Sequence, residues 1–154
     1  MVFEDATLEK VVREYLGKPK GAIYSSDLEA VDALRILDNS CSFRDDEGDP
    51  QSIDIKFEGE PVKSAADLKY FPNLKRFVCF GEIQDLTPFK ELTNLTVIEI
   101  YKSSVDAPKI TDITPLAGLT VLADLYVRET NLDADDVAAL QKQLPDCDIR
   151  SDFD

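Results

Sequence analysis

The sequence contains no histidine and no tryptophan, and its 154 residues include only six glycines, three cysteines and one methionine. Without histidine the chain cannot build a Ser-His-Asp or Cys-His nucleophile or a histidine-based zinc site. The phosphate-binding motifs GxxxxGK[ST] and GxGxxG and the nucleophile motif GxSxG are also absent. Carboxylate pairs arise by chance among 31 acidic residues. We therefore expect neither enzymatic activity nor a cofactor or metal.

Basic residues are also scarce, because 17 Lys and Arg stand against 31 Asp and Glu, a formal net charge of −14. Affinity for nucleic acid is built mainly on Lys and Arg, so this balance argues against a nucleic-acid partner. It argues equally against docking on an anionic membrane surface. No apolar run has the length of a membrane span, so we expect no membrane insertion. Strong acidity favours a monomer.

The cysteine count is odd and no CxxC occurs, which argues against a disulfide framework or a zinc site. Cys79 and Cys147 lie in apolar patterns and are expected to be buried thiols. The N-terminal sequence MVFEDATLEKVV lacks the basic start and apolar segment of a signal peptide. The chain as it stands is expected to be cytoplasmic, or located at the cell surface or secreted if a leader was removed.

Three segments of the chain resemble one another. Residues 83–95 read IQDLTPFKELTNL and residues 110–122 read ITDITPLAGLTVL, with seven identical positions and two apolar exchanges. A third copy, VKSAADLKYFPNL at 62–74, precedes the first by 21 residues, and the later two are 27 residues apart. Self-similarity of this period is typical of repeat proteins. One unit cannot bury its own apolar side, so we expect the units to stack.

A strand-like segment follows each copy: LKRFVCF at 74–80, LTVIEIY at 95–101 and LADLYVR at 122–128, with a weaker version, VDALRIL, at 31–37. Apolar residues alternate along them, as in a strand with one buried face. The residues expected to face the core are Val31, Leu34 and Ile36; Leu74, Phe77 and Cys79; Leu95, Ile98 and Ile100; and Leu122, Leu125 and Val127.

The combined pattern, LxxLxL followed by IxD[IL]xPLxxL, resembles the bacterial, internalin-like leucine-rich repeats over residues 1–37 and 62–149. The resemblance implies an α/β solenoid, a short right-handed β-α superhelix with a parallel sheet and helical N-terminal and C-terminal caps. It also implies a protein–protein interaction module without catalysis. Within each return arc, Asp85 and Asp112 are expected to bind backbone amides, and Pro88 and Pro115 to pre-set a turn.

We expect one leucine-rich-repeat domain over residues 1–154. For its ends, the sequence predicts a helix over 5–16 that Asp5 caps, and a second helix that begins after Asp133 and is stopped by Pro145. The expected parts are a helical N-terminal cap over 1–30, a first repeat with a long acidic insertion or hairpin over 31–61, repeats over 62–132, a helical C-terminal cap over 133–149 and a tail over 150–154.

Two insertions depart from the pattern. Residues 38–61 hold eight acidic residues, and their second part alternates as a strand around Ile55. The run DDEGDP before it is a loop by composition. Its early glycine and following Pro50 suit a solvated turn better than a calcium loop. The second insertion, YKSSVDAPK at 101–109, is either a tolerated surface loop or one that modulates binding.

The strand residues between the buried ones are expected to project from the concave face of the sheet, side by side on strands about 4.8 Å apart. Tyr and Arg are common among interface hot spots, which favours a binding face for an unidentified protein. The alternatives are a glycan or small ligand stacked on the aromatic row, or aromatic strand formers without a partner. The predicted contact residues are Arg76, Val78, Phe80, Val97, Glu99, Tyr101, Asp124, Tyr126 and Arg128.

Overall fold

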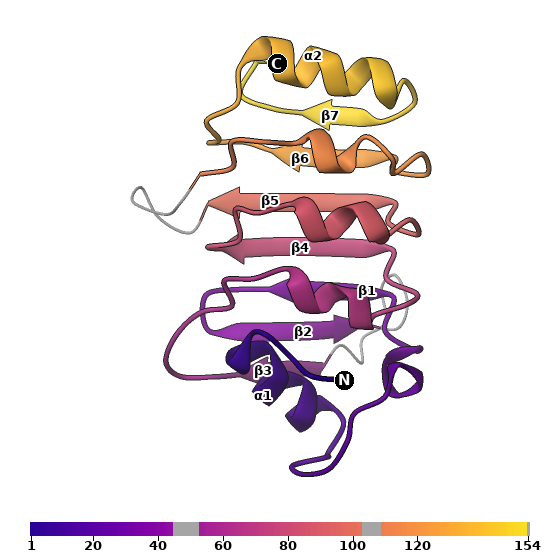
Figure 1. The fold of residues 1–154 in the computed structure, drawn as a ribbon. Coiled ribbons are helices and arrows are strands. Elements are labelled where there is room, and N and C mark those ends of the chain that lie inside the picture. Colours follow the sequence, from indigo (N-terminus) through magenta and orange to yellow (C-terminus); the bar gives the residue numbers. More distant parts are fainter. Residues whose placement is uncertain (45–52, 103–108, 154) are drawn as a thin grey trace.

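An open seven-stranded sheet, with β3 at one edge and β7 at the other, organises the chain (Figure 1). The structure is a computed structural model that describes residues 1–44, 53–102 and 109–153. The strand order is β3-β2-β1-β4-β5-β6-β7. The strands are β1 (Ala33–Ile36), β2 (Ser40–Arg44), β3 (Ile53–Lys56), β4 (Arg76–Gly81), β5 (Val97–Lys102), β6 (Asp124–Val127) and β7 (Asp148–Arg150).

The sheet is mostly parallel, as β1 and β4 to β7 run in one direction. At the other edge the sheet is not parallel, because β2 is antiparallel to both β1 and β3. Strands β2 and β3 both lie within residues 38–61, the segment predicted to be an insertion or hairpin outside the repeat pattern. Only residues 37–39 connect β1 to β2. A parallel crossover needs about a dozen residues or more, so this short link permits only a hairpin. The run DDEGDP, and most of the second insertion, lie outside the described residues.

Short 3-10 helices return the chain from one strand to the next. In Figure 1 the last three of them lie over the same face of the sheet. The second also contacts the third, and the third contacts the fourth. The repeated sequence copies therefore form stacked return arcs. The described 3-10 helices are η1 (Ser25–Leu28), η2 (Ala66–Tyr70), η3 (Thr87–Glu91) and η4 (Thr114–Leu116).

Each arc begins with the same local hydrogen bond. Asp85 and Asp112 accept a hydrogen bond from the backbone amide two residues later, at 2.9 and 2.8 Å, as predicted. In the first copy, the Ser64 hydroxyl accepts the equivalent bond at 3.1 Å. Pro88 and Pro115 then occupy the first turn of their 3-10 helices, where a missing amide hydrogen costs nothing. The Asp and Pro of the repeat are thus confirmed as turn-forming residues.

The core lies between the sheet and the return arcs. Every residue predicted from the alternation to face inward is at most 5% exposed, which confirms the strand register of the repeats. Phe77 on β4 is fully buried, and its ring meets that of Phe89 edge-on, with centroids 5.2 Å apart. Each repeat therefore contributes its side chains to one continuous apolar layer.

The three cysteines are free and buried, which confirms the prediction for Cys79 and Cys147. Burial raises the pKa of Cys41 and of Cys79 to about 12, and that of Cys147 to about 11. The thiols therefore stay protonated at neutral pH and act as small apolar side chains.

A helix lies near each end of the sheet (Figure 1). The N-terminal helix α1 (Ala6–Tyr15) lies near β3, and Asp5 caps it by accepting hydrogen bonds from the two amides Thr7 N and Leu8 N. The C-terminal helix α2 (Ala134–Gln143) lies beyond β7, and Asp133 caps it within a reciprocal capping box. Both predicted N-caps are confirmed, because each carboxylate satisfies amides that the first turn leaves unpaired.

The described helices are all too short or too polar to cross a membrane. Among the described residues there is also no cluster of three or more potential metal ligands. The remaining surface of interest is the face of the sheet opposite the return arcs.

Candidate binding face on the sheet

One face of the sheet carries the strand residues that point away from the return arcs, and we call it the outward face. The strand register places its side chains in rows that run across the sheet. One row places Val78, Glu99, Tyr126 and Arg150 on adjacent strands. The next row holds Arg76, Val97, Asp124 and Asp148. Outward residues that were predicted strand by strand on β4, β5 and β6 are therefore neighbours across the sheet.

The aromatic residues of the outward face stack on one another. The rings of Phe80 and Tyr101 are nearly parallel, at 7° and with centroids 4.2 Å apart, and the Tyr126 ring lies 4.6 Å beyond. The Arg128 guanidinium lies 5.4 Å from the centre of the Tyr126 ring. We call Phe80, Tyr101 and Tyr126 the aromatic stack. Phe80 is 37% exposed, whereas the two tyrosines are half-buried by their neighbours.

A polar network holds the middle of the stack in place. Glu99 forms an ion pair with Arg76 on the neighbouring strand and accepts a hydrogen bond of 2.8 Å from the Tyr101 hydroxyl. Desolvation raises the pKa of Tyr101 to about 12, and the hydrogen bond to Glu99 and its negative charge act in the same direction. Tyr101 therefore keeps its proton, and its ring position, over the physiological pH range.

Titration of the tyrosines tests this network. Because the pKa of Tyr101 is raised from 10.0 to about 12 in the folded state, its contribution to stability is complete below pH 10.0 and is lost as the pH rises toward 12. In a tyrosinate absorbance titration, Tyr101 should ionise in a late step near pH 12. The Tyr101→Phe variant should lack that late step, whereas Tyr24→Phe, at a residue 62% exposed and off the face, should retain it. A late step that survives Tyr101→Phe would contradict the assignment.

A hollow of about 230 Å³ lies beside the aromatic stack. Six of the nine predicted contact residues line it: Arg76, Val97, Glu99, Tyr101, Asp124 and Tyr126. Val78 points to the same face but is only 4% exposed, so the side chains around it cover it. Phe80 and Arg128 stand at the two ends of the aromatic row, outside the hollow. The outward face is therefore a hollow beside a stack, where the sequence predicted an open row of side chains.

Three further residues line the hollow: Leu125, which the alternation placed in the core, and Asp148 and Arg150, which the sequence did not indicate as contact residues. Asp148 and Arg150 are the new contact candidates. They come from β7, which follows α2 in the segment assigned to the helical cap and the tail. Arg150 forms an ion pair with Asp148 at 2.7 Å and lies 3.6 Å from Asp124 on β6. The sequence did contain a pattern that indicates this strand. Apolar Cys147 and Ile149 alternate with charged Asp148 and Arg150, the same period of two residues as in the repeats.

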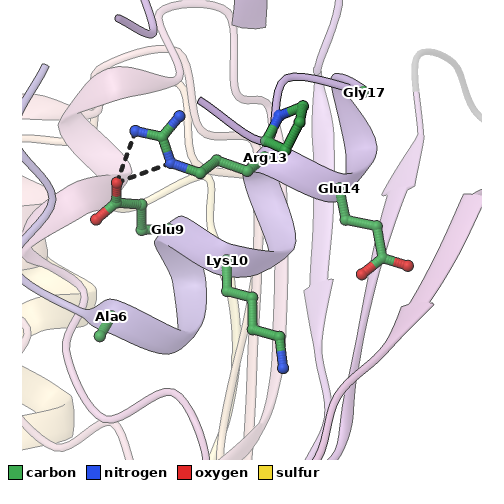
Figure 2. Close-up of a pocket in the computed structure, with 7 residues that line it drawn as sticks. Ala6, Glu9, Lys10, Arg13, Glu14 and Gly17 are labelled. Atoms are coloured by element: carbon green, nitrogen blue, oxygen red, sulfur yellow. Dashed lines mark hydrogen bonds and ion pairs between the residues drawn. The ribbon is translucent and has the colours of Figure 1, made fainter. Parts of the chain in front are cut away.

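A larger hollow of about 630 Å³ lies along the exposed side of α1. Figure 2 shows that Glu9 and Arg13 point toward each other, whereas Lys10 and Glu14 point away from that pair. Glu9 and Arg13 are one turn apart and form an ion pair at 2.8 Å. Such a pair is common on a solvated helix. Size alone therefore does not make this hollow a binding site, and the outward face remains the candidate.

Neither a protein-family model nor a curated protein sequence matches the chain. Among solved structures, an internalin (inlF) from Listeria monocytogenes str. 4b F2365 matches with a TM-score of 0.60 and 28% sequence identity. The fold is internalin-like. The match covers 92% of this chain and 35% of the inlF chain, so the internalin-like fold described here spans about a third of that protein. Internalin C2 (inlC2) of the same strain matches at a TM-score of only 0.38 and 15% identity, over 96% of this chain and 83% of its own.

Proposed function

We propose that this chain is a non-catalytic interaction module that binds a protein partner through the outward face of its sheet. The observation that supports this proposal best is the aromatic stack, which leaves Phe80 37% exposed on an open sheet face. Aromatic side chains with fixed neighbours lose little entropy on binding, and Tyr and Arg are enriched in hot spots. The likeness to an internalin supports the same class of function.

The proposed contact surface keeps the predicted residues apart from the covered Val78, and it adds Asp148 and Arg150. Around the hollow, both signs of charge already pair with each other, as Arg76 does with Glu99 and Arg150 with Asp148. A partner would therefore meet an ordered, nearly neutral polar patch beside an apolar stack. This arrangement of polar and aromatic groups is typical of protein interfaces.

The solenoid assignment is part of the same proposal. We infer that α1 and α2 act as caps of a short right-handed β-α superhelix, α1 beside β3 and α2 beyond β7. Stacked repeats need such ends because an open solenoid would expose its core to water. A capped unit leaves the sheet face available for a partner.

Binding of a glycan to the aromatic row is the weaker alternative. A stacking platform must present the flat face of a ring to the sugar. Here Phe80 covers one face of the Tyr101 ring and Tyr126 packs against the other. At the two ends of the stack, the Arg128 guanidinium lies 5.4 Å from the centre of the Tyr126 ring, whereas Phe80 is 37% exposed, so Phe80 offers the more open ring face. The stack is therefore better suited to contact a partner with its edges and its exposed end than to bind a sugar between free rings.

The double variant Tyr101→Ala, Tyr126→Ala tests the proposed function. It should abolish capture of any partner that the unmodified chain captures specifically, and it should lower the Tm modestly, because aromatic pairs contribute about 0.5–1.5 kcal/mol each. Tyr24→Ala is the matched control, since Tyr24 is 62% exposed and lies off the outward face. Pull-down with the three proteins, each checked for folding by circular dichroism, gives the measurement. Normal capture by the folded double variant would refute the proposal.

A further inference from the structure

Arg35 on β1 continues the outward face beyond the strands already discussed. It pairs in register with Val78 on β4 and with Ser42 on β2, and it is half-buried between them. Within the part of the chain that the structure describes, its Nε atom is buried and has no hydrogen-bond partner. Three arginines on β4, β6 and β7, or directly after them, have partners: Arg76 and Arg150 form ion pairs, and Arg128 lies over the Tyr126 ring.

The polar groups on either side of Arg35 are already engaged. On the β2 side, the Ser42 hydroxyl donates a hydrogen bond to Asp54 on β3. On the other side, the Glu99 carboxylate is shared between Arg76 and Tyr101. The immediate neighbour on β4, Val78, is apolar and 4% exposed. Arg35 thus places a cation against a partly apolar surface, without a counter-charge that the structure describes.

A guanidinium that is partly removed from water and lacks an acceptor destabilises the free protein. Its planar fork of N–H donors matches the two oxygens of a carboxylate, and such charge-assisted pairs are strong. We infer that the two terminal Nη groups of Arg35, which unlike Nε are not among the buried unpaired atoms of the described residues, bind a carboxylate side chain of the protein partner, next to the aromatic stack. The inference rests on the proposed function and adds the chemistry of one contact to it.

The charge of the whole chain restricts what kind of segment can carry this carboxylate. A net charge of −14 repels an acidic segment during approach. Attraction to one arginine acts only within about 10 Å at moderate salt. The partner segment should therefore carry one carboxylate among neutral, aromatic or basic residues. A uniformly acidic segment does not fit.

A peptide library displayed on phage provides the first test. Peptides selected on the unmodified protein should share one Asp or Glu, and replacing it by Asn or Gln in a synthetic peptide should weaken binding about tenfold or more. Arg35→Gln should remove that preference while peptides still depend on Tyr101. The inference about Arg35 would be wrong if the selected peptides shared no acidic position. It would also be wrong if Arg35→Gln selected peptides with the same acidic position. Neither outcome would contradict the proposed function. If no peptide distinguishes the protein from the Tyr101→Ala, Tyr126→Ala variant, the proposed function fails as well.

Stability of the free chain provides the second test. Arg35→Met keeps a long apolar side chain and removes the unpaired guanidinium, so the Tm should rise by about 2–4 °C. Arg76→Met is the matched control on the next strand. It breaks the ion pair with Glu99 and should lower the Tm. A fall in Tm for Arg35→Met as large as that for Arg76→Met would mean that Arg35 serves the fold, and the inference would be wrong.

Discussion

Replacing Phe77 by alanine is expected to lower the free energy of unfolding by about 3–5 kcal/mol. Phe77 is 0% exposed, lies near the start of β4, and packs edge-on against Phe89 of the neighbouring return arc. The substitution leaves a cavity in the layer that joins the sheet to the arcs. Because small domains are stable by only about 5–15 kcal/mol, this loss is a large fraction of the total. Urea unfolding followed by circular dichroism measures it.

Phe80→Ala is the matched control for that prediction. Phe80 lies on the same strand three residues later, but it is 37% exposed and belongs to the outward face. Its loss removes one ring contact with Tyr101, worth about 0.5–1.5 kcal/mol. Equal losses for the two variants would contradict the assignment of an inner and an outer face to β4.

Replacing Asp67 by alanine is expected to cost about 3 kcal/mol, the second largest effect. Asp67 is fully buried in η2, and its carboxylate accepts hydrogen bonds from the backbone amides of Glu4 and Asp5 at 2.8 to 3.0 Å. These bonds attach the segment before α1 to a return arc more than 60 residues away. Alanine would leave both amides without an acceptor. The measurement is again urea unfolding.

The Asp85→Ala variant is the control for Asp67. Asp85 also accepts a backbone hydrogen bond, from Thr87 at 2.9 Å, but it is exposed, so water can replace the carboxylate. Its loss should cost about 1 kcal/mol or less. Hydrogen exchange adds a local readout, because the Glu4 and Asp5 amides should exchange faster in Asp67→Ala. Unchanged exchange at both amides would show that the attachment does not depend on Asp67.

The repeated part of the fold could be predicted because its pattern is local. Alternation in 95–101 and 122–128 places Ile98 and Leu125 inside, and the structure buries both at 1% or less. The turn residues Asp85 and Asp112 act within two residues of their own position, so the sequence alone reveals their partners. The direction of β2 also depends on a local feature, the three-residue link after β1. The repeat pattern does not extend over this segment, so it did not indicate where β2 begins.

The candidate site could be predicted only in part. Alternation identified which residues of β4 to β6 point outward. It could not show that Val78 is covered, because that depends on the side chains across the sheet. The alternation also could not show that the outward face includes Arg35 and Arg150. Their strands, β1 and β7, become neighbours of β4 and β6 only in the folded sheet. The stacking of Tyr101 between two rings likewise joins residues from three strands.

The sequence by itself determined the repeat, the buried side of each strand, the return turns and the N-caps of both helices, because each of these depends on residues a few positions apart. Tertiary structure decided the rest. Asp67 stands where the other copies have Pro88 and Pro115, and only the folded chain brings Glu4 and Asp5 to its carboxylate. The same reason applies to the ion pairs of the hollow and to the unpaired Nε of Arg35. The residues around each charged group come from strands far apart in the sequence, and only the folded sheet brings them together.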